Sequence, residues 1–557
     1  MPFRYRRASL ILGVTQDPAF KAALQQKGIS EAEARAQLEH FVRGVKPTRL
    51  LRPATVRDGI DTTIDEIFAD DIGRYQDALR YGLKPLRMVP ASGAASRMFE
   101  VLNKFLNEFQ QGQKPYMVQG RFSYPAFLAL SEEGLTDNEK ADRKFLKAFI
   151  GNLKAFALWP HLQFSAQNDD IDLAAELEAG FIENILLYLL TDKGIDCASQ
   201  PKAFLEFHRY ADGSVRTAME EQLREAAALE KDAQGVVRVH FTISPEHEAA
   251  FVTLRDGLIK NLQNELKLTF EITHSFQSPA TDTIAVGMDN QPFRKKDGSF
   301  LFRAGGHGAL IKNLNDLPLG NVVFIKNVDN VQRDEGRADT VQWKQALAGV
   351  LIHAHELRDE LLDDMEGWRM GRKLNEENLL GTWWVARDEL GVKIEDSVWK
   401  GLSNRKRYEL LKQCLDRPIR VCGMVKNEGE PGGGPYWVRH ADGSSSLQIV
   451  EKDEMDKNDA EQMALVKAAT HFNPVDLVVC LTRPDGGRYD LTNYVDNDRW
   501  FMAQKSVEGT PIKALERPGL WNGGSGKWLT IFVEVPLTTF SPVKTINDLA
   551  RPEHRTP

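Results

Sequence analysis

The spacing of hydrophobic residues predicts a strand, a small-residue loop and a helix near residue 90. Pro85–Pro90 is a short apolar run of the kind that forms a buried strand. Ala91–Ser96 contains only small residues. Arg97–Gln110 then has helical spacing, with its apolar residues on one face at Met98, Leu102, Phe105, Leu106 and Phe109. This unit is the best-defined local architecture of the chain.

The same alternation of strand and helix returns after residue 236. Val237–Ser244 alternates as a strand does, His247–Leu266 is helical, and Lys267–His274 alternates again. Asn321–Lys326 is a further apolar strand. Later strands are predicted at Arg420–Val425, Leu447–Val450, Leu477–Leu481 and Leu529–Val535. Repeated alternation of this kind predicts a layered α/β protein.

Helical patterns dominate two other parts of the chain. The stretch up to about residue 85 predicts helices, the clearest being Glu31–Val42, where Ser30 is the N-cap of a capping box. Residues 137–232 predict a mostly helical insertion, with a strongly apolar helix at Ala174–Leu190. The predicted domains are an N-terminal helical segment (1–84), an α/β core (85–136 and 233–480), the helical insertion (137–232) and a C-terminal α/β extension (481–557).

Composition narrows the class of protein. The chain has 557 residues, of which 42% are hydrophobic and 27% charged, as is typical of a folded protein and not of a disordered one. The net charge of −8 speaks against nucleic acid as a partner. Four cysteines without a CxxC pair predict reduced thiols. No apolar run approaches the roughly 20 residues of a membrane span, and no signal peptide is recognisable, so we expect a cytoplasmic protein.

The loop Ala91–Ser96 is the first candidate for chemistry. Small residues let backbone N–H groups approach a polyphosphate, and the helix that follows presents its positive end to the same anion. Arg97 is placed to add a bidentate phosphate contact, and Lys104 lies two turns further on. The alternative is a tight strand-to-helix turn without a ligand.

Two further loops carry candidate residues. Gly305–Gly308 surrounds His307 with glycines, so backbone amides and one imidazole can face a base or a phosphate. Asn327–Asn330 follows a buried strand, where ligands of α/β sheets bind, and Asp329 there is a natural Mg²⁺ ligand. The alternatives are a glycine-rich surface turn and an Asn/Asp turn.

Taken together, these loops resemble the nucleotide-diphospho-sugar transferase superfamily, and in particular the uridylyltransferases that make UDP-sugars. The resemblance lies in Ser92–Met98 with Lys104, in Gly305–Gly308, and in Asp329 followed by Asn330. Ala95 and Ser96 stand where that family usually has Gly and Thr. Over its length, from about residue 25, the chain is similar to a bacterial family known only as domain of unknown function 4301.

The resemblance implies a GT-A-like three-layer α/β/α core with a mixed or mostly parallel sheet, helical insertions and a β-rich C-terminal part. It implies transfer of a nucleoside monophosphate, most readily uridylyl, from a nucleoside triphosphate to a sugar 1-phosphate, with Mg²⁺ as cofactor. The implied nucleotide-binding residues are Ala91, Ser92, Gly93, Ala94, Ala95, Ser96, Gln277, Gly305, Gly306, His307 and Asn327. Implied roles elsewhere are catalysis for Arg97 and Lys104, substrate binding for Asn473 and Lys505, and metal binding for Asp329.

Three other functions fit parts of the sequence. A non-catalytic nucleotide-sugar binder would keep the fold without turnover. A GT-A glycosyltransferase usually carries Asp-x-Asp at the strand end, of which Asn327-Val-Asp329 is only a variant. An interaction scaffold would use the charged helices and would bind no nucleotide.

Overall fold

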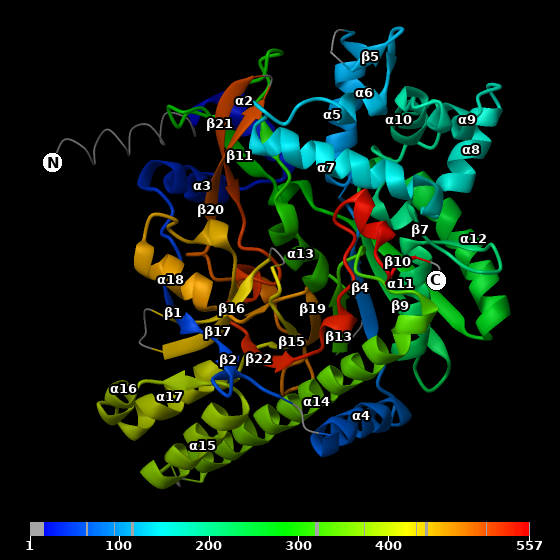
Figure 1. The fold of residues 1–557 in the computed structure, drawn as a ribbon. Coiled ribbons are helices and arrows are strands. Elements are labelled where there is room, and N and C mark those ends of the chain that lie inside the picture. The colour runs from blue at the N-terminus through cyan, green and yellow to red at the C-terminus, as the bar shows by residue number, and fades with distance from the viewer. Residues whose placement is uncertain are drawn as a thin grey trace.

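The architecture confirms the predicted α/β class, with helices packed on a mixed central sheet (Figure 1). The structure is a computed structural model. It describes residues 16–62, 65–93, 95–112, 116–317, 322–371, 374–429, 432–440, 444–507 and 509–555.

The central sheet has the strand order β10, β9, β4, β13, β19, β15, and both β22 and β18 pair with β15. The bounds of these strands are Thr269–Phe276 (β10), Val236–Ile243 (β9), Leu86–Pro90 (β4), Val322–Lys326 (β13), Asp476–Cys480 (β19), Ile419–Lys426 (β15), Leu529–Glu534 (β22) and His471–Phe472 (β18). Parallel pairing runs from β10 to β13, whereas β19 is antiparallel to both β13 and β15. The carboxyl ends of β10, β9, β4, β13 and β15 therefore lie on one edge.

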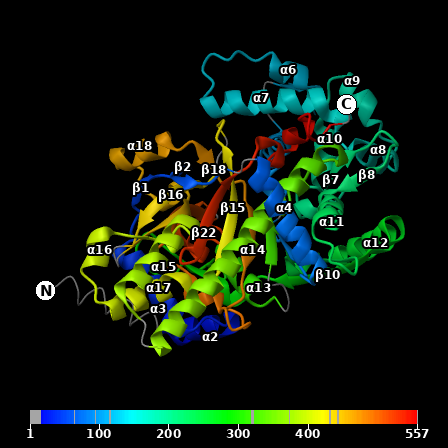
Figure 2. The same ribbon diagram turned by 90° about the horizontal axis from the view of Figure 1, so that it is seen from below.

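Different layers cover the two faces of this sheet. Val322 and Phe324 pack in one apolar cluster with helix α14 (Asp334–Met370), which crosses below β15 and β22 beside α4 (Asp65–Arg80) (Figure 2). Val323 faces the other way, toward Leu310, Leu314 and Trp437. Burial on both faces explains why β13 is apolar at almost every position.

The second face is covered by short elements. They are helix α13 (Leu310–Asn315) and a four-stranded sheet of β1 (Leu50–Pro53), β16 (Gly434–Arg439), β17 (Ser444–Val450) and β14 (Lys393–Ile394). A second small sheet has the order β12 (Phe302–Arg303), β11 (Thr283–Val286), β21 (Thr510–Glu516) and β20 (Phe501–Val507).

Residues 137–232 contain mainly helices, at the upper right of Figure 1. The elements there are α7 (Asp137–Asn152), α8 (Trp159–Gln167), α9 (Leu173–Glu178), α10 (Glu183–Leu190), β7 (Glu206–Arg209), β8 (Val215–Thr217) and α11 (Ala218–Leu229). The single helix expected at Ala174–Leu190 is wrong, because the chain turns at Gly180 with φ 86° between α9 and α10. Helix α5 (Glu100–Gln110) shares one apolar core with α10 and with Val543 and Ile546.

Two other local expectations need correction. The N-terminal stretch is helical at α2 (Pro18–Lys27) and at α3 (Glu31–Arg43), where Ser30 caps the helix as predicted. However, Leu50–Pro53 is a strand, because it pairs with β16 from a distant part of the chain. Likewise α5 begins at Glu100 and not at Arg97, since Ala95–Arg97 forms a short 3₁₀ turn first.

Further short strands, together with several helices, lie in the described part of the chain. They are β2 (Thr55–Val56), β3 (Gly59–Ile60), β5 (Met117–Val118), β6 (Arg121–Phe122), α6 (Tyr124–Leu128), α12 (Glu248–Leu266), α15 (Glu376–Glu389), α16 (Asp396–Lys400), α17 (Asn404–Leu415) and α18 (Ala460–Ala468). All four cysteines are buried. Within the described part of the chain, no helix is both long enough and apolar enough to cross a membrane.

Candidate functional site

The candidate site lies where β10, β9, β4 and β13 end. These strands are parallel neighbours, so the loops that follow them meet at one edge of the sheet. Ala91 follows β4, Asn327 follows β13, Ser244 follows β9 and Gln277 follows β10. The fold thus brings together loops that are far apart in sequence.

Ser92 connects three of these loops. Its hydroxyl oxygen accepts a hydrogen bond from Nε2 of Gln277 (3.1 Å), and its carbonyl accepts one from the Ser244 hydroxyl (2.7 Å). The N–H groups of Ser92 and Gly93 donate to no other described residue, whereas those of Ala91 and Ala95 donate to Thr242 and Gln200. Ala94 lies outside the described residues. The amides of Ser92 and Gly93 can therefore face an anion.

The two predicted catalytic cations differ in their surroundings. Arg97 is exposed and forms no ion pair with any described residue. Lys104 donates from Nζ to Oδ2 of Asp142 in α7 at 2.5 Å, and this hydrogen bond raises the pKa of Lys104. Ser96 is exposed beside Arg97. Arg97 is thus free to meet a ligand, while Lys104 is engaged with the insertion.

Asp329, the predicted metal ligand, is paired with a lysine that the sequence did not single out. Nζ of Lys202 donates to Oδ2 of Asp329 at 2.7 Å and to the Val543 carbonyl at 2.8 Å. The backbone carbonyl of Asp329 also accepts from the Val543 N–H at 3.1 Å. The backbone carbonyl of Asn327 accepts a hydrogen bond from Nε2 of Gln222 (2.9 Å). Lys202 lies in the insertion without a recognisable motif, and only the fold reveals it.

The residues around Asp329 do not fit a magnesium ion held by the protein. Among the residues that the structure describes, no three His, Cys, Asp or Glu side chains are grouped to hold a metal. The ammonium group of Lys202 already contacts the Asp329 carboxylate. A divalent ion on this carboxylate would lie against a like charge, which is unfavourable at such short range.

The glycine-rich loop after β12 is tightly packed. A Cβ added to Gly305 would lie 2.5 Å from the Thr281 carbonyl, and one on Gly308 would lie 2.6 Å from Arg517. Gly306 has φ 63°, which favours glycine. Close packing against neighbouring chain therefore accounts for these glycines.

The His307 ring is closely packed between Trp521 and Gly519. Its ring stacks on Trp521 with centroids 4.3 Å apart, and a Cβ on Gly519 would lie 1.8 Å from the ring. Burial lowers the pKa of His307, although Glu451 and Glu516 act in the opposite direction. A neutral imidazole at this position can contact a ligand through its edge, but both of its faces are packed against protein.

The two residues predicted to bind the substrate also have protein partners. Lys505 donates from Nζ to Oε1 of Glu516 at 2.6 Å, and Glu516 adjoins Gly306. Asn473 is buried before β19, and its Oδ1 accepts from the Val475 N–H at 3.0 Å. The Nδ2 group of Asn473 has no partner in the described part of the protein and is a free donor near the edge.

Immediately below the edge lies a fully buried ionic network. Glu225 on α11 accepts hydrogen bonds from Lys326 (2.7 and 2.9 Å) and Lys344 (3.0 Å), and its carboxylate lies 3.1 Å from Arg87. Glu230 and Asp476 complete the network. Burial alone would raise the pKa of Glu225, but the three cations together hold it well below its usual value. The network joins β4, β13 and α14 beneath the site.

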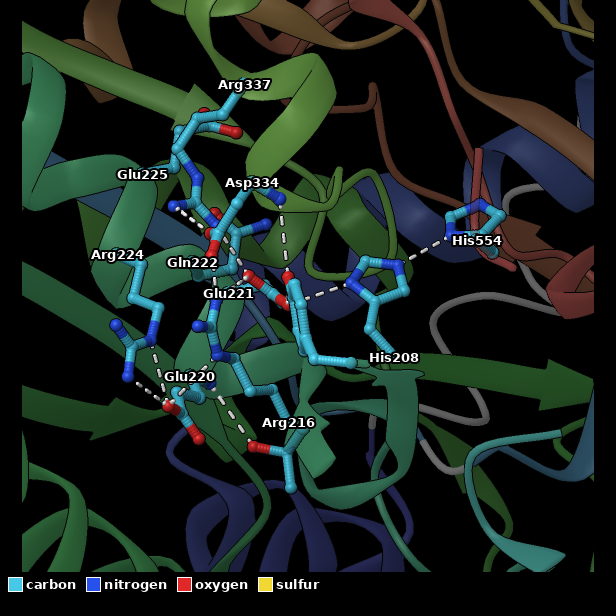
Figure 3. A network of polar contacts seen from close by, with 12 residues as sticks. His208, Arg216, Glu220, Glu221, Gln222, Arg224, Glu225, Asp334, Arg337 and His554 are labelled. Carbon is cyan, nitrogen blue, oxygen red and sulfur yellow. Dashed lines mark hydrogen bonds and ion pairs between the residues drawn. The ribbon is translucent and has the colours of Figure 1, made fainter. Parts of the chain in front are cut away.

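A second buried cluster, on the same helix, holds the C-terminal segment (Figure 3). Glu221 accepts from the Tyr210 hydroxyl (2.7 Å) and from Arg337 (2.6 Å), and its Oε1 lies 2.8 Å from Nδ1 of His208. Nε2 of His208 is hydrogen-bonded to Nδ1 of His554 at 2.8 Å. This chain of contacts fastens the residues around Val543 to the insertion.

Residues 18–555 match the family described as domain of unknown function (DUF4301), and the chain belongs to that family. No curated protein matches the chain.

Among solved structures, the chain is similar to UDP-sugar pyrophosphorylases from Leishmania major and Trypanosoma brucei. One is a mutant UDP-glucose pyrophosphorylase from Leishmania major, with 12% identity, a TM-score of 0.43, and coverage of 96% of this chain and 78% of that one. Another is the uridine diphosphate N-acetylglucosamine pyrophosphorylase from Trypanosoma brucei in complex with an inhibitor, with 11% identity, a TM-score of 0.43, and coverage of 97% and 81%. These likenesses are loose, so the function has to be inferred from the residues of this chain.

Proposed function

We propose that this protein is a nucleotidyltransferase that moves a nucleoside monophosphate, uridylyl in the first place, from a nucleoside triphosphate to a sugar 1-phosphate. The observation that supports this most is the convergence of the Ser92, Gln277 and Asp329 loops at one edge of the sheet. Arg97 is exposed at the same loop. Free amides, an unpaired guanidinium and a sheet edge are what a polyphosphate needs.

Nucleotidyl transfer requires that the two substrates are positioned correctly, and it does not require a nucleophile from the protein. A phosphate oxygen of the sugar 1-phosphate attacks the α-phosphorus, the bond from that phosphorus to the bridging oxygen breaks, and pyrophosphate leaves. In this proposal Arg97 and the amides of Ser92 and Gly93 hold the phosphates and stabilise the charge that develops. Gln277 and His307 face the nucleoside, and Asn473 offers Nδ2 to the sugar. Lys104 and Lys505 must leave Asp142 and Glu516 before they can contribute.

Thermal unfolding in the presence of UTP, CTP, GTP, ATP and dTTP tests the proposal. A ligand at a hundred times its dissociation constant should add about 2.7 kcal/mol to the stability and raise the unfolding temperature clearly. Arg97→Ala should remove most of that shift. Arg80→Ala is the matched control, because Arg80 is also exposed and pairs with Asp77 on its own helix. Pyrophosphate release with sugar 1-phosphates then identifies the acceptor. A protein that no triphosphate stabilises is not a nucleotidyltransferase.

A non-catalytic nucleotide-sugar binder is the second candidate. The Asp329 carboxylate is occupied by Lys202, and the Ala95 amide is occupied by Gln200, which favours holding a ligand over transforming it. Such a protein would be stabilised by a UDP-sugar and would release no pyrophosphate from any triphosphate and sugar 1-phosphate.

A further inference from the structure

The pair of Lys202 and Asp329 is neither fully buried nor freely solvated. Its side chains are 17% and 16% exposed, and the Nζ to Oδ2 distance is 2.7 Å. Lys202 follows Pro201 and begins a 3₁₀ turn (Lys202–Phe204), and its Nζ also donates to the Val543 carbonyl at 2.8 Å. The ammonium group is therefore held at the end of β13 and remains within reach of solvent.

The segment that carries Lys202 is fastened to the candidate phosphate loop from two sides. The carbonyl of Gln200 accepts from the Ala95 N–H at 2.9 Å. Val543, whose carbonyl accepts from Lys202, belongs to the segment whose Ile546 N–H donates to the Met98 carbonyl. The lysine thus lies between Asp329 and the loop Ala91–Met98.

The donors of Lys202 are only partly used. An ammonium group has three N–H donors, and the contacts within the described part of the protein take two of them, one to Asp329 and one to Val543. The third donor and the positive charge remain for an anion that enters the site. Asp329 and Val543 fix the direction of the group, so little side-chain entropy is lost when the anion binds.

We propose that the Lys202 ammonium group, in place of a divalent ion held by the protein, is the cation that Asp329 presents to the phosphates of a bound nucleoside triphosphate. This inference rests on the proposed function and assigns a phosphate-binding role to a residue of the helical insertion. Asp329 is then a positioning residue that acts through Lys202. The ion that accompanies the triphosphate in solution is not required for it to bind.

Binding of UTP to the full chain, measured by calorimetry with Mg²⁺ and again with EDTA, tests the inference. The wild-type protein should bind UTP in both conditions with similar affinity. Lys202→Met should weaken binding roughly 10- to 100-fold, because a charge-assisted hydrogen bond is lost. Lys202→Arg should retain more of the binding than Lys202→Met. Lys154→Met is the matched control, since Lys154 is an insertion lysine in an exposed pair with Glu178.

A double variant guards against a simple folding defect. Lys202→Met leaves the Asp329 carboxylate without its partner, whereas Lys202→Met with Asp329→Asn removes both charges. If the double variant unfolds at the wild-type temperature and still binds UTP weakly in both conditions, the inference stands. Asp329→Asn alone should weaken binding less than Lys202→Met.

Two results would overturn the inference, and they are distinguishable. Binding that requires Mg²⁺ and is unchanged in Lys202→Met would refute the role of Lys202 and leave the proposed function standing. A wild-type protein that binds no triphosphate in either condition would refute both.

Discussion

Two carboxylates near the end of β13 have opposite surroundings. Glu225 lies below the sheet edge, contacted by Lys326, Lys344 and Arg87, and nothing of its side chain is open to a ligand. Asp329 lies above the edge, has one lysine partner and is partly exposed. The strand ends at Lys326, which contacts Glu225, and Asp329 follows three residues later, so the two environments are close along the chain. A buried ionic network in which Glu225 contacts three cations stabilises the fold, whereas the partly exposed pair of Asp329 and Lys202 is available for binding.

Removal of the Glu225 charge should have the largest effect. Glu225→Gln leaves buried cations incompletely paired, and breaking such a pair costs about 3–5 kcal/mol of the free energy of unfolding. Urea unfolding measures it. Glu178→Gln, at an exposed carboxylate paired with Lys154, should change the stability by less than about 1 kcal/mol. Equal effects at the two positions would show that the network is not structural.

The second largest effect should be the pH dependence of the stability that comes from burying His554. Burial, with His208 adding to it, lowers the pKa of His554 to about 3, against an ordinary value of 6.5. The unfolded chain binds more protons between these values, so the stability is complete above pH 6.5 and falls as the pH drops toward 3. At pH 5 the loss should be about 2 kcal/mol. Urea unfolding at pH 7 and pH 5 measures it, and His554→Gln should show a smaller difference between the two.

The same comparison predicts a modest effect on stability at Asp329. Asp329→Asn removes one charge from a pair that is partly exposed, and the cost should be about 1 kcal/mol or less. Thermal unfolding without ligand measures it. A loss as large as that of Glu225→Gln would mean that the Lys202 pair is part of the structural core.

The smallest effect is expected at Lys104. Its pair with Asp142 is half-exposed, so Lys104→Met should cost less than about 0.5 kcal/mol in unfolding experiments. A large loss of nucleotide binding in this variant would show that Lys104 leaves Asp142 to reach the phosphates.

The sequence predicted the central sheet well and the site only partly. Strands such as β4 and β13 are recognisable because burial on both faces makes most of their positions apolar. The β1 strand was missed because its pairing depends on residues almost four hundred positions away. Loops that follow parallel strands meet at one edge, so Ser92, Gln277 and Asp329 could be grouped from the chain alone. Lys202 could not, because its partner is set by how the insertion folds back.

The fastening of Asp329 and Lys202 by Val543 has a consequence for the order of synthesis. Val543 is 341 positions after Lys202, so a ribosome produces it on the order of 20–70 s later. During that interval the apolar core that Val543, Ile546 and Leu549 complete is exposed beside α5 and the insertion. The nascent chain therefore exposes an apolar surface next to an incomplete site until its last segment docks.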